Sequence, residues 1–282
     1  MKLQYHRDPR GNFGDDLNEP FFTEICPEYQ ESRYDKLYGI GTLLNKSAGT
    51  IRNSIIFGSG YGQGAAPVID QRSTHIVGVR GPLTARALGL DEQSVIGDPA
   101  LLLPKIEKFN GGGAPKRRIV ICLHHRTAEE RDFPSQPVSD VAFLDPGTNS
   151  LEDYIATIKN ADLVLAEAMH GAIVAAAYQV PFLRVKLLGK YDEGKWEDFL
   201  QSLHIPNLAA TDLLKMQPSR FRQGELLLLR KMGRKSFYKS LPGRPLSDPE
   251  IENIIEESML LYRARPGLVA HERQLSEIHE RL

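Results

Sequence analysis

The segment AEAMHGAIVAAAY, residues 166–178, contains the residue type best suited to proton transfer near neutral pH. His170 comes just after a short apolar run and begins a stretch of small and apolar residues. This pattern predicts a buried strand followed by a helix that packs closely on a sheet, with the imidazole fixed at the sheet's edge. A histidine placed there could act as a general acid or base. A satisfied core histidine is the alternative.

A second pattern lies near the N-terminus, in GNFGDDLNEPFF at residues 11–22. Its glycines would let the backbone approach a ligand closely, but Asp15 and Asp16 already place negative charge at the predicted helix N-terminus, which disfavours a phosphate there. Together with Asn12, these carboxylates could hold sugar hydroxyls or orient a catalytic group. The alternative is that Asp15 or Asp16 caps a helix that runs to about Ile25.

Cationic side chains follow other predicted strands. Arg80 stands at the end of a strand in VGVRGPLTARAL, just before a helix N-terminus, where a guanidinium can bind a carboxylate or phosphate through two hydrogen bonds. Arg184 and Lys186 end a later strand, PFLRV and the residue after it. They could form a basic pocket for an anion together with two further lysines, Lys190 and Lys195. Structural salt bridges and solvated charges are the alternatives.

His124, His125 and Arg126 form another polar cluster, directly after the apolar strand RIVICL. No cysteine or carboxylate stands beside them at metal-ligand spacing, so a metal site is not predicted. We interpret them as substrate contacts or surface residues.

Elements that could position these groups recur along the chain. Short apolar strands alternate with helices of about 10 to 15 residues, which predicts two parallel α/β units, each a Rossmann-like sheet. Asp98, in IGDPALLL, is expected to cap a turn. The segment EKFNGGGAPKRR is the predicted linker, which gives an N-terminal domain at 1–113 and a C-terminal domain at 114–246.

A helical tail is predicted at 247–282. The run DPEIENIIEESMLLY has the period of an amphipathic helix, which we expect to pack back across the first domain. Its predicted apolar face consists of Ile251, Ile254, Ile255, Met259 and Leu260.

Composition narrows the function classes. A net charge of -1 over 282 residues offers no global field for nucleic acid, and the two cysteines, Cys26 and Cys122, are expected to be buried thiols. The N-terminus lacks the apolar run of a signal peptide and no window reaches the roughly 18 apolar residues of a membrane span, so we expect a cytoplasmic protein. The motifs of nucleotide hydrolases, serine hydrolases and dinucleotide oxidoreductases are absent.

The sequence resembles the polysaccharide pyruvyl transferase family, and within it the bacterial exopolysaccharide branch of succinoglycan-type ketal-forming enzymes. The resemblance covers the N-terminus to about residue 190, and it rests on the order and spacing of these blocks: NFGDDLN, GSGYG, VRGPLTARALGL, GDPALLL and AEAMHGAIVAAAYQVPFLRV.

This resemblance implies a fold like that of the GT-B glycosyltransferases, with two domains facing across a cleft that holds the site. It implies phosphoenolpyruvate as donor, a sugar of a lipid-linked repeat unit as acceptor, a cyclic pyruvate ketal as product and no cofactor or essential metal. The first domain would be the acceptor side and the second the donor side. We expect the reaction to occur at the inner face of the cell membrane.

The resemblance and the chemistry of the residues together suggest roles. His170 matches the family's histidine and is expected to be the general acid or base, with Asp15 as a second catalytic residue that orients the sugar. Arg80 matches a donor-binding position, and Asn12 and Asp16 would bind the acceptor. The chain has Ala168 where many members have an arginine, so the expected donor contact must come from elsewhere. The candidates for it are Arg184, Lys186 and His124.

A basic segment between Arg230 and Arg244, RKMGRKSFYKSLPGR, could contact anionic lipid headgroups or a lipid-linked phosphate, or be a solvated loop. Two other functions are compatible with the sequence: a glycosyltransferase of the same architecture that uses a nucleotide sugar, and a carbohydrate-binding protein without catalytic activity.

Overall fold

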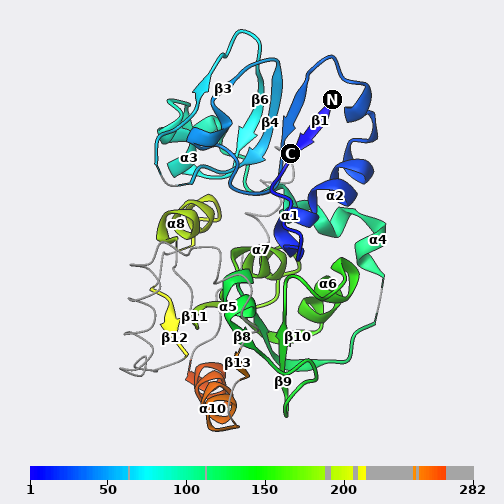
Figure 1. The fold of residues 1–282 in the computed structure, drawn as a ribbon, viewed down its shortest axis with the longest axis vertical. Helices are drawn as coiled ribbons and strands as arrows, with labels where there is room; N and C mark the ends of the chain where they lie inside the picture. The colour runs from blue at the N-terminus through cyan, green and yellow to red at the C-terminus, as the bar shows by residue number, and fades with distance from the viewer. Residues whose placement is uncertain are drawn as a thin grey trace.

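The structure of the protein is a computed structural model, and it describes residues 1–62, 64–111, 113–187, 192–205, 209–213, 244–245 and 248–264. Two parallel sheets organise these residues, one in each half of the chain (Figure 1). The predicted α/β class with parallel sheets is therefore confirmed. The predicted boundary near residue 113 and the GT-B-like arrangement of two separate domains remain predictions.

The first sheet contains four parallel strands in the order β1-β2-β4-β6. Because the strands are parallel and follow one another in chain order, their carboxyl ends lie along one edge of the sheet. β3 and β5 pair with each other in a separate two-stranded sheet, and in the sequence they lie between strands of the larger sheet. The bounds are β1 Lys2–Gln4, β2 Lys36–Tyr38, β3 Thr50–Ile51, β4 Ser54–Ser59, β5 Val68–Ile69 and β6 His75–Val79.

The first turn after β1 differs from the prediction. Instead of one helix capped by an aspartate, two helices follow each other, α1 (Phe13–Asp16) and α2 (Asn18–Ile25). Asn12 is the N-cap residue of α1, so Asp15 and Asp16 lie inside the helix and do not cap it. The prediction of an aspartate cap is wrong because the helix begins at Phe13, before both carboxylates.

The connections after β6 match the sequence pattern. α3 (Pro82–Ala87) begins with Pro82, whose missing N–H is no loss in a first helical turn. Asp98 caps the 3₁₀ helix Pro99–Lys105, since its side chain accepts a hydrogen bond from the N–H of Ala100 at 3.1 Å. The other short elements of this half are 3₁₀ helices at Pro27–Glu31, Lys46–Ala48 and Glu92–Ser94, and α4 at Glu107–Asn110.

The second sheet contains five parallel strands in the order β12-β11-β10-β7-β9. Chain order reverses between β7 and β10, because β9 follows on one side of β7 and β10 on the other. A reversal of this kind opens a crevice at the carboxyl ends of the two central strands, where α/β proteins bind ligands. The bounds are β7 Arg117–Cys122, β9 Val141–Leu144, β10 Ala161–Ala166, β11 Phe182–Lys186 and β12 Thr211–Asp212.

Helices in this half follow the predicted alternation. The Ser150 side chain caps α6 by accepting a hydrogen bond from the N–H of Asp153 at 3.1 Å. α7 is almost wholly buried, because its small residues allow close packing on the sheet: a Cβ on Gly171 would lie 2.5 Å from the Cβ of Cys122 in β7. The helices are α5 His125–Glu130, α6 Leu151–Lys159, α7 Met169–Ala177 and α8 Glu193–Ser202.

The two halves share one hydrophobic core. Its buried members include Leu3 and Phe13 from the first half and Val120 and Ile173 from the second. α7 packs on the 3₁₀ helix at Pro99–Lys105, and α8 packs on α3 (Figure 1). The carboxyl ends of both sheets are thereby held near each other. Cys122 is buried and Cys26 is half-buried, and both are free thiols.

The tail helix α10 (Asp248–Ala264) has the predicted position in the sequence but packs elsewhere. Ile254 is fully buried in a cluster with residues of the second sheet, such as Ile119 and Leu163, and Ile251 and Ile255 pack against the same cluster. Figure 1 accordingly places α10 at the end of the molecule away from the first sheet. The expectation that this helix packs on the first domain is wrong, because its apolar face covers an apolar face of the second sheet.

An ion pair fixes the start of this helix. Arg131, in β8 (Arg131–Asp132), contacts Glu250 at 2.7 Å, and both side chains are largely buried. β8 also pairs with β13 (Arg244–Pro245). The remainder of the basic segment Arg230 to Arg244 lies outside the described residues.

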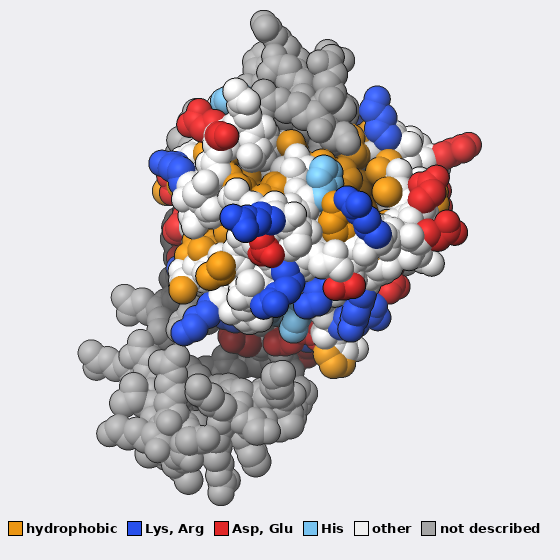
Figure 2. All heavy atoms as spheres, turned by 90° about the horizontal axis from the view of Figure 1, so that it is seen from above, with side chains coloured by type: hydrophobic (Ala, Val, Ile, Leu, Met, Phe, Trp, Pro, Cys, Tyr) orange, Lys and Arg blue, Asp and Glu red, His pale blue; other side chains and the backbone are white. Residues whose placement is uncertain are grey.

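The surface at the amino ends of the first sheet is of mixed charge. Exposed cations there include Lys2, Lys36 and Arg52, with the exposed Asp35 among them. The view from above shows Lys and Arg side chains interspersed with acidic and apolar ones (Figure 2). Among the described residues, no helix combines the length and the apolar character needed to cross a bilayer.

Candidate active site

A cavity of about 930 Å³ lies where the carboxyl ends of the two sheets meet. Its wall combines segments that are far apart in the sequence: the turn after β1, the turns after β2 and β4, the turns after β7 and β10, and the start of α8. Of the eight residues to which the sequence assigned a catalytic, donor-binding or acceptor-binding role, five line it: Asn12, Asp15, His124, His170 and Lys186. Other lining residues include His6, Thr42, Arg126, Glu167, Lys195 and Trp196.

His170 is the second residue of α7, at the crevice between β7 and β10. Its ring rests directly on Gly14 of α1, since a Cβ on Gly14 would lie 1.9 Å from the ring's Nδ1. Its Nε2 is buried and has no hydrogen-bond partner among the described residues. Burial, reinforced by the positive charges of Arg80 and Lys195, lowers the pKa of His170 to about 3. The imidazole is therefore neutral and has an unused nitrogen.

Asp15 reaches the same cavity from the other half of the chain. Its Oδ2 accepts a hydrogen bond from the Asn12 side chain at 2.5 Å. Burial raises the pKa of Asp15 to about 6, although His6 and the Asn12 hydrogen bond act in the opposite direction. This carboxylate is thus ionised at neutral pH but can take up a proton at mild acidity.

Asp16 has a different environment from that of its neighbour. Its Oδ2 accepts a hydrogen bond from the backbone N–H of Asn12 at 2.8 Å, which closes the turn before α1. Asp16 is not among the residues that line the cavity. The structure therefore brings Asn12 and Asp15 together with His170 in the cavity wall, whereas Asp16 is not part of that wall.

His124 lines the cavity on the second sheet's side. Its Nδ1 accepts a hydrogen bond from the N–H of Arg126 at 3.3 Å, and its ring lies 4.2 Å from that of His125. Burial lowers the pKa of His124 to about 3, and the neighbouring His125 and Arg126 add to this effect. His124 is accordingly a neutral group in this site, whereas Lys186 is an exposed cation at the wall.

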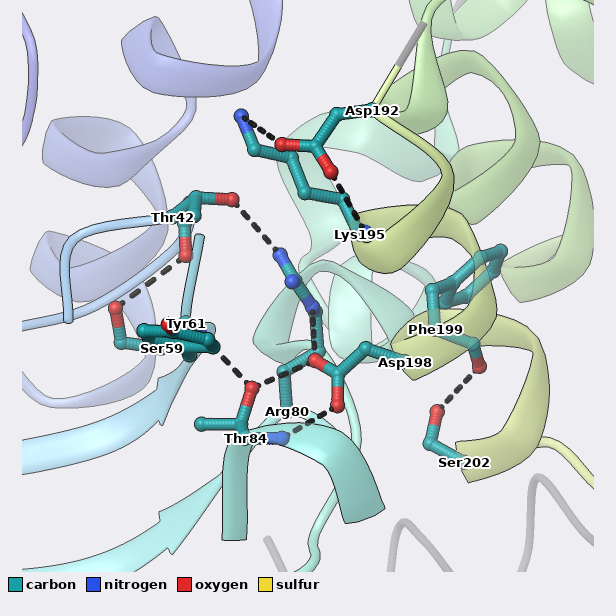
Figure 3. Close-up of polar contacts among 11 residues, drawn as sticks. Thr42, Ser59, Tyr61, Arg80, Thr84, Asp192, Lys195, Asp198, Phe199 and Ser202 are labelled. Atoms are coloured by element: carbon teal, nitrogen blue, oxygen red, sulfur yellow. Dashed lines mark hydrogen bonds and ion pairs between the residues drawn. The ribbon is translucent and has the colours of Figure 1, made fainter. Parts of the chain in front are cut away.

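Arg80 lies one layer behind the cavity and is fully buried. Its Nε donates to Asp198 Oδ2 at 3.0 Å and its Nη1 donates to Thr42 Oγ1 at 3.2 Å (Figure 3). Asp198 also accepts hydrogen bonds from Thr84, from the backbone N–H at 2.9 Å and from Oγ1 at 2.7 Å. Arg80 is therefore held by a carboxylate from α8, and its Nη2 is buried without a partner among the described residues.

Arg184 is also buried and also outside the cavity wall. It pairs with Glu193 at 2.6 Å and its guanidinium lies 4.9 Å from the centre of the Trp196 ring. Both partners belong to α8 and line the cavity, so Arg184 contacts residues of the wall. Of the two additional lysines, Lys195 lines the cavity and Lys190 lies outside the described residues.

Two buried carboxylates near the cavity were not singled out by sequence reasoning. Glu167 is buried at the end of β10, where its carboxylate accepts hydrogen bonds from the N–H of His124 at 3.0 Å, from Thr127 Oγ1 at 2.9 Å and from the N–H of Leu187 at 3.0 Å. Its position directly after an apolar strand could have indicated a buried carboxylate that accepts hydrogen bonds from neighbouring turns. Asp198 has no comparable local signal.

The fold and the cavity define a parallel α/β protein whose site lies at the strand reversal of its second sheet, with the first sheet's loops as the opposite wall. Among the described residues, no three His, Cys, Asp or Glu side chains are grouped as a metal centre. That the reaction needs no metal stays a prediction.

Comparison with known proteins gives the family. The chain belongs to the polysaccharide pyruvyl transferase family, whose model matches residues 14–186. It is also 33% identical over 211 residues to the succinoglycan biosynthesis protein ExoV of Rhizobium meliloti (strain 1021). This match covers 73% of the chain and 66% of that protein, so the chain spans just under two thirds of its relative. No solved structure matches the chain. The predicted family is confirmed, and the relative supports the predicted succinoglycan-type branch.

Proposed function

We propose that the protein transfers the pyruvyl group of phosphoenolpyruvate to two hydroxyls of a sugar in an exopolysaccharide repeat unit. The observation that carries this proposal is the meeting of His170 and Asp15 across one cavity, in a chain of the pyruvyl transferase family. The cavity's volume of about 930 Å³ is at the upper end of the range typical of small-molecule sites, which leaves room for a donor and a sugar together.

The reaction requires two proton transfers. One sugar hydroxyl adds to the central carbon of phosphoenolpyruvate, whose methylene carbon gains a proton and becomes a methyl group. Phosphate then leaves with its electron pair, and the second hydroxyl adds to the same carbon to close the ketal. Two protons are released by the two hydroxyls. One accounts for the proton that the methylene carbon gains, and the other ends on the released phosphate.

The two titratable groups suit these steps. Asp15 is ionised at neutral pH and can accept a proton from a sugar hydroxyl, because burial brings its pKa to about 6, close to working pH. His170 is neutral, with a free Nε2, and can hydrogen-bond the reacting hydroxyl or relay its proton. Because the His170 ring packs on Gly14, the neighbour of Asp15, both groups can act on the two hydroxyls of one sugar.

The proposal extends to the acceptor and its location. A lipid-linked sugar would bring the reaction to the inner face of the cell membrane, with Asn12 and Asp15 toward the sugar. Asp16 would act through the turn that positions Asn12.

Direct turnover tests the proposal. The protein is incubated with phosphoenolpyruvate and a galactose- or glucose-bearing repeat-unit acceptor, and phosphate release and product mass are measured. The expected result is one phosphate released for each acceptor that gains a carboxyethylidene group, and loss of both in His170→Ala. Protection against thermal unfolding by a nucleotide sugar, with none by phosphoenolpyruvate, would favour a glycosyltransferase instead.

A further inference from the structure

The start of α8 contributes a group of cavity residues that lies beyond the part of the chain that matches the family model, which ends at residue 186. Asp192, Glu193, Lys195 and Trp196 all line the cavity. The helix is fixed in this position by Asp198, one turn further on, through its hydrogen bonds to Arg80 and Thr84 (Figure 3). A buried carboxylate thus fixes the helix that presents Lys195.

Lys195 is the cation of this group. Its side chain is 37% exposed, and its one ion pair with a described residue is a long contact of 3.9 Å to Asp192 Oδ2. That distance exceeds the range of a hydrogen bond, so the three N–H donors of the ammonium are available to a ligand. The carbon chain of Lys195 extends toward the first sheet's loops, because its Cε lies 4.0 Å from the position of a Cβ on Gly62.

Its charge acts on the other cavity groups. The positive charge of Lys195 opposes the rise in the pKa of Asp15 and adds to the lowering of the pKa values of His124 and His170. Lys195 lines the same cavity as these three groups, so its charge acts within the site.

A second feature nearby also favours an anion. α7 begins at Met169 in the cavity wall, and no side chain caps its N-terminus. The first N–H groups of a helix carry partial positive charge, which suits phosphate, although that of Gly171 already donates to the carbonyl of Ala168 at 3.1 Å. The N-terminus of α8, in contrast, is capped by the Asp192 side chain, which accepts a hydrogen bond from the N–H of Lys195 at 3.3 Å.

We propose that Lys195 is a phosphate-binding residue of this cavity and holds the phosphate of the donor near the N-terminus of α7. The identity of the donor as phosphoenolpyruvate rests on the proposed function; the phosphate site itself does not. The ammonium stabilises the charge of the phosphate as it leaves, and Arg80 acts behind it by fixing α8 through Asp198.

A structural role for Lys195 makes a different prediction. If its ammonium only offsets the negative charges of Asp15 and Asp192, its removal should change stability or the pKa of Asp15 without changing affinity for phosphate. Anion affinity therefore separates the two roles.

The experiment measures the Kd for inorganic phosphate and for phosphoenolpyruvate by calorimetry, without acceptor. It compares the wild type with Lys195→Met, which keeps the carbon chain, with Lys195→Arg, which keeps the charge, and with Lys116→Met. Lys116 is an exposed lysine with a surface ion pair to Asp162 and serves as the matched control. Thermal unfolding of each variant confirms that it is folded.

We expect Lys195→Met to raise the Kd for both anions by about tenfold or more, because a charge-assisted hydrogen bond is lost. Lys195→Arg should remain within a few-fold of wild type and Lys116→Met should be unchanged. In turnover, Lys195→Met should raise the KM for phosphoenolpyruvate and leave the KM for the acceptor unchanged. Lys195→Gln is the second variant if Lys195→Met does not fold.

The outcomes separate this inference from the proposed function. If ketal forms but Lys195→Met binds both anions as tightly as wild type, the inference is overturned and the proposed function stands. If phosphate binds in a manner that depends on Lys195 but no ketal forms with any acceptor, the proposed function fails and the phosphate site stands. A wild-type protein that binds neither anion overturns the inference.

Discussion

At the scale of single residues, the environment of the cavity shifts two titratable groups in opposite directions. Burial penalises the charged form of each, so it raises the pKa of Asp15 to about 6 and lowers that of His170 to about 3. Groups whose pKa values are shifted by burial in one site are candidates for distinct acid–base roles. Here the carboxylate is the group that titrates near working pH, and the imidazole is not.

Asp15→Asn tests the role of the carboxylate. Because only the ionised form accepts a proton, wild-type activity should fall as pH decreases through about 6. The variant should lose about 100-fold or more in kcat, the usual scale of general acid–base catalysis, and its residual activity should lack this acid limb. Phosphate release measured from pH 5 to 8 checks both. The control variant Asp35→Asn changes an exposed carboxylate at the amino end of the first sheet and should keep the fall in activity below about pH 6. If that fall persists in Asp15→Asn, Asp15 is not the base.

Gly14→Ala tests the contact between the two halves at the histidine. The new Cβ would lie 1.9 Å from Nδ1 of His170, so the ring or α1 must move. Since displacement of a catalytic group by about 1 Å can cost about 100-fold, we expect a loss of kcat of that order, together with a loss of about 1 to 3 kcal/mol in the free energy of unfolding from the overpacked contact. Gly111→Ala is the control, because open space surrounds its Cβ position. Full activity of Gly14→Ala would mean that this ring position is not needed.

At the scale of elements, α8 depends on a pair of residues separated by more than a hundred positions in the sequence. Arg80 and Asp198 are both almost completely buried, and the carboxylate also accepts two hydrogen bonds from Thr84. A buried pair contributes little net stability when complete, but removal of one partner leaves a charge without compensation. The position of α8, and with it Lys195 and Trp196, therefore relies on this contact.

Asp198→Ala should reduce the free energy of unfolding by about 3 to 5 kcal/mol, because it leaves the Arg80 guanidinium buried and unpaired. Denaturant unfolding measures the change. The matched control is Glu152→Ala, which removes a carboxylate from a half-exposed pair with Lys108 and should cost less than about 1 kcal/mol. Equal losses in the two variants would contradict the role assigned to Asp198.

Local patterns in the sequence predicted the elements more reliably than their contacts. The strands and helices around His170, and the caps formed by Ser150 and Asp98, were predictable because apolar periodicity and capping chemistry act over a few residues. The pairing of Arg80 with Asp198 was not, since nothing near either residue signals a partner 118 positions away. For the same reason Arg184 could be placed at a strand end but not beside Trp196.

At the scale of the whole molecule, the last helix that the structure describes, α10, packs on the second sheet. An amphipathic helix shows from its sequence that it has an apolar face, but not which of two apolar surfaces will cover that face. α10 covers the cluster that contains Ile119 and Leu163, and the ion pair between Arg131 and Glu250 fixes its start. This packing leaves the cavity end of the second sheet unobstructed by α10.

Ile254→Ala tests this placement. Ile254 is fully buried against the second sheet, so the truncation should reduce the free energy of unfolding by about 2 to 5 kcal/mol. Leu260→Ala on the same helix is the control. Leu260 was predicted to belong to the apolar face, but its side chain is 51% exposed, so the change should stay within about 0.5 kcal/mol. Denaturant unfolding of the full chain measures both, and a neutral Ile254→Ala would show that α10 contributes little to the fold.

The unequal strand orders of the two sheets have a consequence for how related enzymes can diversify. The second sheet reverses between β7 and β10 and so has a crevice of its own, whereas the strands of the first sheet follow one another in chain order and that half supplies α1 and loops to the cavity wall. Those loops can change in length and sequence without disturbing the crevice, because loop variation is tolerated on a fixed scaffold. On the proposed function, new sugar specificities would arise by exchange of the loops after β2 and β4, while the chemistry of the donor is inherited unchanged.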